Sequence, residues 1–330
     1  MQAISLLALP HIVIRNLLLP KTYLHDDSDF DVIINTIARD RDIPPTLIEK
    51  DYWIMHCLYG LQQAGKTFYL KGGTSLSKGF KIIDRFSEDI DILIKPQGGQ
   101  DVKCGKNHDS KAHREGRRKY YETLTNELDI DGIHKIVRDT EFDDKTGKYR
   151  SGGIRLYYQT SHDIPQDLKE GIILEVGFDK VSPHKKVTIS SWAFDSAKEK
   201  GFSYIDNRAI DVPCYRPEYT FVEKLHAINK KYEQEQSGKG FDANFMRHYY
   251  DLYKLLEMKE VIDFIGSEEY ERHKKTRFKS AKLNQASLLD NPDTFKAYEE
   301  RYELSKTLYY KEKPTFNEII ERLRSFNARF

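Results

Sequence analysis

The chain contains 330 residues, which exceeds the roughly 100–200 residues of a usual single domain and predicts two domains or one enlarged domain. Because 39% of its residues are hydrophobic and 12% aromatic, it can bury a core, and a disordered chain is excluded. The 53 Lys and Arg residues balance 52 Asp and Glu residues, which argues against a wholesale binder of polyanions but not against a local basic patch. Cys57, Cys104 and Cys214 are far apart and indicate neither a disulfide framework nor a structural zinc site, so a reducing cytoplasm fits best.

Residues 1–27 form an apolar N-terminal segment, the one place where a membrane has to be considered. Pro10, His11 and Arg15 interrupt the apolar run, no basic stretch precedes it, and no small-residue cleavage site follows. We therefore expect no membrane-spanning helix and no signal peptide, but a segment that packs on the body of the protein or on a partner.

Residues 28–215 alternate between helical and strand patterns, which predicts an α/β unit. Helices are expected over 28–43, from Thr46 towards Gly65 and over 74–83, and strands over 67–70, 89–94, 133–140, 149–160, 171–178 and 187–191. Between 97 and 119 we expect a flexible basic loop that runs into a helix. Residues 216–330 are predicted to form a helical domain, with helices over 217–231, 244–258, 260–275, 294–306 and 315–326.

The run from Gly60 to Thr67 matches the phosphate-loop pattern G-x-x-x-x-G-K-[ST] letter for letter. Such a loop follows a strand and precedes a helix, so that backbone amides and the helix N-terminus face the phosphates. Here a helix precedes and a strand follows. We interpret the run as a helix C-terminus with a glycine cap and a solvated Lys66.

A glycine turn after the first strand is the first candidate for a nucleotide site. Its residues are Gly72, Gly73, Thr74 and Ser75. Two glycines let backbone amides approach a polyphosphate, and the two hydroxyls add donors at the start of a helix. Lys78, Arg85 and Ser87 lie within reach of the same phosphates or else stay at the surface.

Carboxylates on the predicted strands are the candidate metal ligands. Asp89 and Asp91 are two apart on a strand and share one face, while the alternating isoleucines face a core. Two carboxylates on one face repel unless a cation lies between them, and oxygen ligands suit Mg²⁺. Glu175, the only charge in an apolar strand, is either a third ligand or an edge-strand glutamate that reaches solvent.

Several runs together resemble the nucleotidyltransferases of the DNA polymerase β-like fold, and in particular the AbiEii/AbiGii toxin family. The runs are Glu49-Lys50-Asp51-Tyr52-Trp53, Gly72-Gly73-Thr74-Ser75 with Ser87-Glu88-Asp89-Ile90-Asp91, Pro217-Glu218-Tyr219-Thr220 with Glu223-Lys224-Leu225-His226-Ala227, and Arg247-His248-Tyr249-Tyr250-Asp251-Leu252. The resemblance covers about residues 45 to 255. It implies an α+β fold, a mixed sheet with flanking helices followed by a mainly helical C-terminal region.

The resemblance implies a two-metal nucleotidyl transfer in which Asp89 and Asp91 hold Mg²⁺ against the phosphates of an NTP. The glycine turn would hold the triphosphate, Lys224 would contact phosphate, and Asp251 would act as a base or orient the acceptor. The alternatives are a lysine exposed on an amphipathic helix and an aspartate in a surface ion pair. The neighbouring His226 and His248 lack metal-ligand spacing and are interpreted as packed helix residues.

The resemblance further implies a toxin with a cognate antitoxin and an RNA acceptor, in particular the acceptor end of tRNA. Two basic segments, 103–119 and 272–282, would contact RNA phosphates or else form solvated charged faces. Transfer to a protein or a small molecule, phosphorylation, and a non-catalytic nucleotide-binding module remain open alternatives.

Overall fold

The computed structural model describes residues 22–96, 102–105, 107–166, 168–179, 181–238, 243–278, 291–305, 308–311 and 313–330. Most of the predicted N-terminal segment therefore lies outside the described residues. Within them, no helix combines the length and the apolar character that crossing a membrane requires.

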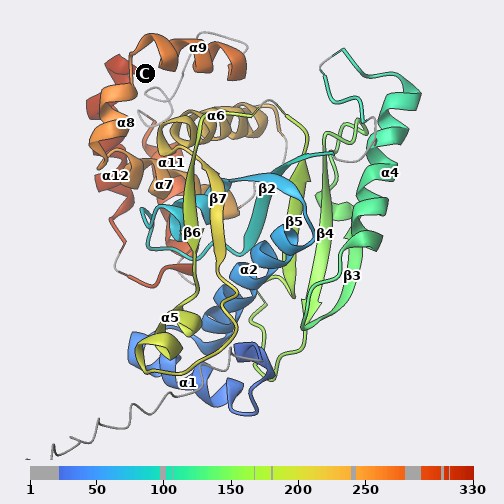
Figure 1. The fold of residues 1–330 in the computed structure, drawn as a ribbon. Coiled ribbons are helices and arrows are strands. Elements are labelled where there is room, and N and C mark those ends of the chain that lie inside the picture. Colours follow the sequence, from blue (N-terminus) through green and yellow to red (C-terminus); the bar gives the residue numbers. More distant parts are fainter. Residues whose placement is uncertain are drawn as a thin grey trace, which may run out of the picture.

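A mixed seven-stranded sheet forms the centre of the described structure (Figure 1). Its strands are β1 (Thr67–Lys71), β2 (Asp89–Lys95), β3 (Ile133–Asp139), β4 (Ser151–Tyr158), β5 (Ile172–Gly177), β6 (His184–Ile189) and β7 (Ala209–Tyr215). The order is β3-β4-β5-β2-β1-β7-β6. The β2–β5 and β1–β7 pairs are parallel, and the other pairs are antiparallel.

Helices surround the sheet and then form a region of their own. They are α1 (Phe30–Arg41), α2 (Pro45–Gln63), α3 (Gly72–Thr74), α4 (Lys111–Glu127), α5 (Trp192–Glu199), α6 (Pro217–Gln236), α7 (Arg247–Leu255), α8 (Lys259–Phe264), α9 (Glu268–Arg277), α11 (Pro292–Leu304) and α12 (Phe316–Phe326). Figure 1 shows α4 along β3 and β4, and α6 to α12 gathered at the opposite side of the sheet. This arrangement confirms the predicted α+β class with a helical C-terminal region.

Helix α2 is buried on every side, including three consecutive charged residues. Consecutive helical side chains point about 100° apart, so Glu49, Lys50 and Asp51 contact three different parts of the protein. Their partners are His162 Nδ1 at 2.8 Å, Glu88 Oε2 at 3.4 Å and Lys78 Nζ at 2.5 Å. Such pairing is what makes burial of the three charges possible.

Two hydrophobic cores divide the molecule. The first lies between the sheet and α1, α2, α4 and α5, and the second lies among α6 to α12. The second core also takes in Leu76 and Ile83, and Leu308 belongs to the first. Residues 308–311 pair with the chain before β2, since Phe86 N donates to Leu308 O at 2.7 Å. Because residues from each side of position 215 belong to the other side's core, the cores do not test the predicted domain boundary near residue 215, which stays a prediction.

Two of the predicted helices are wrong in extent. The helix expected over 74–83 is only α3 and a π-helical turn, Ser75–Gly79, after which Lys81 adopts a positive φ of 55°. The helix expected over 260–275 is split into α8 and α9, because Gly266 has a φ of 85° and Ser267 caps the second helix. Helix α5 and strand β7 were not predicted.

The rejected phosphate-loop match is confirmed as a helix end. Helix α2 ends at Gln63, Gly65 has a φ of 67°, and β1 begins at Thr67. Lys66 pairs with Glu127 at 2.8 Å and is not simply solvated.

Candidate active site

Three carboxylates meet on one face of the sheet because of strand register. Asp89 and Asp91 are two apart on β2, and Asp91 is directly opposite Glu175 on the parallel neighbour β5. Strand β5 lies inside the sheet, between β4 and β2, so the alternative of an edge-strand glutamate is wrong. The structure thus places the three residues predicted as metal ligands on one sheet face, although their carboxylate oxygens do not all lie within 4.8 Å of one another.

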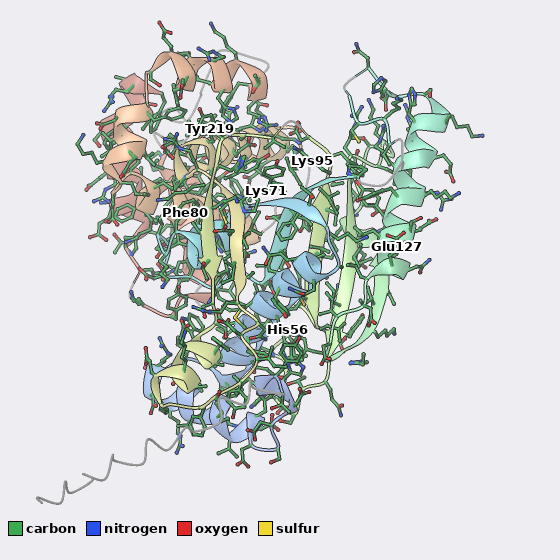
Figure 2. All side chains as sticks on the ribbon, in the orientation of Figure 1. His56, Lys71, Phe80, Lys95, Glu127 and Tyr219 are labelled. Atoms are coloured by element: carbon green, nitrogen blue, oxygen red, sulfur yellow. The ribbon has the colours of Figure 1, made fainter. Side chains whose placement is uncertain are left out.

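The three carboxylates of this cluster repel one another, and positive charge nearby reduces that repulsion. Burial, with Asp91 and Asp89 nearby, raises the pKa of Glu175 to about 8. Burial also raises the pKa of Asp89, and its Oδ1 atom has no hydrogen-bond partner among the described residues. Lys169 Nζ lies 2.5 Å from Asp89 Oδ2, and Lys71 Nζ lies 3.7 Å from Asp91 Oδ1. Figure 2 labels Lys71 near β7 and β2, below α6.

The donor set fits Mg²⁺. It consists of carboxylate oxygens only, one of which is buried and unpartnered, and Mg²⁺ prefers one or two such ligands together with waters and phosphate oxygens. That role remains a prediction for Asp89, Asp91 and Glu175.

The glycine turn lies directly against the carboxylates. Gly72 has a φ of 72°, and a Cβ atom on it would lie 2.1 Å from Asp91 Oδ2. A Cβ atom on Gly73 would lie 2.4 Å from Ser87 Oγ. Only glycine fits these positions, so the backbone amides can approach whatever the carboxylates bind.

The side chains after the glycines hold the turn in place. Thr74 Oγ1 donates to the carbonyl of Asp89 at 2.5 Å, and Ser75 Oγ donates to the carbonyl of Gly72 at 2.9 Å. Both residues are fully buried. Their hydroxyl protons are therefore used within the turn, and donation by these hydroxyls to a phosphate stays a prediction.

Lys78 also departs from its predicted role. Its ammonium group lies 2.5 Å from Asp51 Oδ1 and 5.0 Å from the ring centre of Trp192. Asp51 is fully buried and also accepts from the backbone N–H of Trp192. This buried ion pair favours a structural role for Lys78 over a contact with phosphate.

The helical region contributes a second, cationic cluster. Asp251 on α7 is fully buried and accepts from Arg85 Nε and Nη2, both at 2.7 Å. Lys224 Nζ on α6 lies 2.6 Å from Asp251 Oδ2. A Cβ atom on Gly73 would lie 3.0 Å from Arg85 Nη2, so this cluster borders the glycine turn.

The geometry bears on the expected role of Asp251, a base or an orienter of the acceptor. Burial opposes its ionisation, but Arg85 and Lys224 hold the pKa of Asp251 far below its usual range. Because cations engage both of its oxygens, the arrangement favours an orienting role over a base, and that role stays a prediction. Asp251 also positions two cations. Both alternatives, an exposed Lys224 and a surface ion pair, are also wrong because both residues are buried.

Three cations at the site were not assigned to it from the sequence. Lys71 directly precedes the glycines, and Arg247 opens the run that ends at Leu252, so a signal was present for both. Burial and Arg85 lower the pKa of Arg247, while Glu88 and Asp89 act in the opposite direction. Lys169 comes from the segment before β5 and carries no sequence signal.

The two histidines near the motifs are packed, as expected. His248 is half-buried, its Nδ1 lies 3.3 Å from Lys224 Nζ, and burial lowers its pKa well below the usual value. His226 packs edge-on against Phe278 at a ring distance of 5.2 Å.

The basic segment 103–119 is not a free loop. Arg117 is fully buried and donates to the carbonyls of Lys103, His108 and Lys148. Arg118 pairs with Glu115 and Glu122 within α4. These two arginines stabilise the local fold, whereas Lys111 and Lys119 are exposed on α4, so the expected contact of this segment with RNA stays a prediction.

The second basic segment, 272–282, is described only to residue 278. Arg277 pairs with Asp179 and with Glu223, each at 2.6 Å, while Arg272 and Lys275 are exposed on α9. Helix α9 packs on α6, the helix that carries Lys224. Two exposed cations therefore lie on a helix that packs against the helix of Lys224.

Replacing Glu175 by glutamine is expected to stabilise the metal-free protein, and more so at alkaline pH. The pKa of Glu175 is about 8 in the folded chain and about 4.3 in an unfolded chain. Between these values the folded state keeps a proton that the unfolded state has released, so the wild type loses stability as the pH rises towards 8. From about pH 6 to about pH 8.5 the advantage of the variant should grow by about 2.5 kcal/mol, measured by urea denaturation with a chelator.

The matched control is Glu199→Gln, at an exposed glutamate that ends α5. This variant should differ from the wild type by the same small amount at both pH values. A pH-independent effect of Glu175→Gln would contradict the prediction.

The comparisons with known proteins agree with this geometry. The family described as "Nucleotidyl transferase AbiEii toxin, Type IV TA system" matches residues 54–322, more than half of the chain. The chain belongs to this family. It is therefore a nucleotidyltransferase toxin of a type IV toxin–antitoxin system, which implies an NTP substrate and an antitoxin partner.

Other comparisons add little to this assignment. The structure is similar to that of an antigenic nucleotidyltransferase-like protein from Paracoccidioides brasiliensis, with a TM-score of 0.38 and 13% identity over 76% of this chain and 92% of that chain. A likeness this distant carries no argument about function. No curated protein matches the chain at a significant level.

Proposed function

We propose that this AbiEii-family toxin transfers an NMP group from an NTP to the 3′ hydroxyl of tRNA. In this reaction the acceptor oxygen bonds to the α-phosphorus, the bond to the β-phosphate breaks, pyrophosphate leaves, and the hydroxyl proton passes to solvent. The observation that carries the proposal is the meeting of Asp89, Asp91 and Glu175 on one sheet face, directly against a glycine turn. Its place of action would be the cytoplasm, where NTPs and tRNA occur together.

The chain's own residues divide the work of binding. Asp89, Asp91 and Glu175 would hold Mg²⁺, which when bound supplies Lewis-acid polarisation of phosphate oxygens. The amides of Gly72 and Gly73 approach the phosphates because no side chain intervenes. Arg85 and Lys224 are held by Asp251 beside this turn, where their charges favour the anionic transition state.

Support for an RNA acceptor comes from the exposed basic face of α9. Arg272 and Lys275 lie there, on a helix that packs against α6, the helix that carries Lys224. Surface cations of this kind attract a phosphate backbone without reading its sequence. In the segment 103–119 the buried Arg117 does not contribute in this way, whereas the exposed Lys111 and Lys119 on α4 would.

The test is the placement of label after incubation with Mg²⁺, each NTP labelled at the α- or the γ-phosphate, and total RNA or total protein. We expect α-label on tRNA and none on tRNA whose 3′ diol has been oxidised with periodate. Label from the α-phosphate on protein would mean that the acceptor is a protein and not tRNA. Label from the γ-phosphate would indicate a kinase. Bound nucleotide without any transfer would indicate a non-catalytic module.

A further inference from the structure

Lys169 enters the site from the segment before β5, and its backbone is fixed on both sides. Its N–H donates to Glu88 Oε2 at 2.9 Å, and its carbonyl accepts from Lys50 Nζ. Glu88 and Lys50 are 3% and 1% exposed, and their charged atoms lie 3.4 Å apart. A buried ion pair on α2 and beside β2 thus holds one residue of a connecting segment at the site.

The ion pair of Lys50 and Glu88 acts as a clamp on the backbone of Lys169. Burying a lysine and a glutamate is costly, and removing either one would leave the other charge unpaired. Both charged groups gain a further hydrogen bond from the backbone of Lys169, whose N–H donates to Glu88 and whose carbonyl accepts from Lys50. We conclude that the position of Lys169, directly beside Asp89, is strongly specified.

The side chain of Lys169 lies where a cation is expected. Its Nζ atom is 2.5 Å from Asp89 Oδ2 and 4.8 Å from the ring centre of Phe142. The other oxygen of Asp89 is buried and has no hydrogen-bond partner among the described residues. An ammonium group and a metal ion cannot both contact the same carboxylate oxygen closely without repulsion.

We propose that Lys169 is an exchangeable cation of the site, which neutralises Asp89 in the metal-free protein and binds a nucleotide phosphate once a divalent cation has taken its place. The lysine stem has four carbons and rotates freely, so the ammonium group moves while the clamped backbone stays. The displaced ammonium group would then bind a phosphate of the NTP, which brings negative charge to the site. This inference rests on the proposed metal-dependent nucleotidyl transfer.

The experiment measures Mn²⁺ binding to the chelator-treated protein by electron paramagnetic resonance of free Mn²⁺, without nucleotide. Lys169→Met should bind Mn²⁺ about tenfold more tightly than the wild type, because a competing charge is removed. With Mn²⁺ present, the same variant should bind a non-hydrolysable NTP about tenfold more weakly. Lys169→Arg should restore NTP binding, because it restores the cation.

The matched control is Lys66→Met, which removes a lysine that pairs with Glu127 away from the carboxylates. It should leave both affinities unchanged. Acetylation of wild-type Lys169 by an amine reagent, followed by mass spectrometry, needs no variant. It should increase with Mn²⁺ and decrease again when the NTP analogue is added.

The outcomes separate this inference from the proposed function. Mn²⁺ binding that is lost in Asp91→Asn but unchanged or weakened in Lys169→Met would overturn the inference alone. Acetylation that Mn²⁺ does not alter would do the same. Absent Mn²⁺ binding in the wild type, or full binding in Asp91→Asn, would refute the metal site and both proposals with it.

Discussion

Asp91→Asn is expected to lower nucleotidyl transfer at least about a thousandfold while the protein stays folded. Asp91 faces Glu175 across the β2–β5 pair and touches the space beside Gly72. Asparagine keeps the shape of the side chain but removes the charge that would hold Mg²⁺. The loss should appear in initial rates of α-label transfer at saturating NTP.

The same substitution should not reduce stability, and this distinguishes a lost ligand from a lost fold. In the metal-free protein it removes a charge that repels Glu175 and Asp89, and it also removes the carboxylate that pairs with Lys71. The two effects oppose each other, so the midpoint of urea denaturation in a chelator should be nearly unchanged. The matched control is Asp211→Asn, at an exposed position in β7. Transfer within tenfold of the wild-type rate would contradict the assignment of Asp91.

Asp251→Asn is expected to lower the free energy of unfolding by about 3–5 kcal/mol. The substitution leaves Arg85 and Lys224 buried with no carboxylate between them. It also places an amide donor against the donors of the guanidinium and ammonium groups. Urea denaturation measures the loss, and nucleotidyl transfer should fall as well because Arg85 borders the glycine turn and Lys224 interacts electrostatically with Asp91.

The matched control for this prediction is Asp263→Asn, which breaks an exposed i,i+4 pair with Lys259 on α8. Surface pairs of this kind contribute a few tenths of a kcal/mol, so the control should be nearly neutral. If Asp251→Asn lowered the free energy of unfolding as little as Asp263→Asn, Asp251 would not be needed to stabilise the buried Arg85 and Lys224. A wild-type transfer rate in a folded Asp251→Asn variant would also refute its positioning role.

Local signals in the sequence predicted the parts of the site that a short stretch of chain builds. The alternation in Asp89–Ile94 predicted one polar and one buried face, and β2 has that pattern of burial. The two glycines predicted a close approach of backbone, which the contacts of Gly72 and Gly73 confirm. Strand and turn geometry depend on neighbouring residues, so they can be inferred without the fold.

The sequence predicted less well the roles of charged residues whose partners come from distant parts of the chain. The sequence left Asp251 as a base or an orienter of the acceptor, and only the structure shows that Arg85 and Lys224 bind its carboxylate. The arginines of the segment 103–119 read as a free basic surface, yet Arg117 binds backbone carbonyls in the interior. The state of a charge depends on its burial and its partners, and a sequence pattern reports neither.

The sequence by itself determined the α+β class, the glycine turn, the spacing of Asp89 and Asp91, and the motifs of the toxin family, since each follows from residues close together along the chain. The tertiary structure alone decided that Glu175 lies opposite Asp91, that Lys169 contacts Asp89, and that Asp251 holds two cations. The physical reason is that strand register and buried ion pairs join distant segments, and their geometry is set only when the sheet and the helical region pack together.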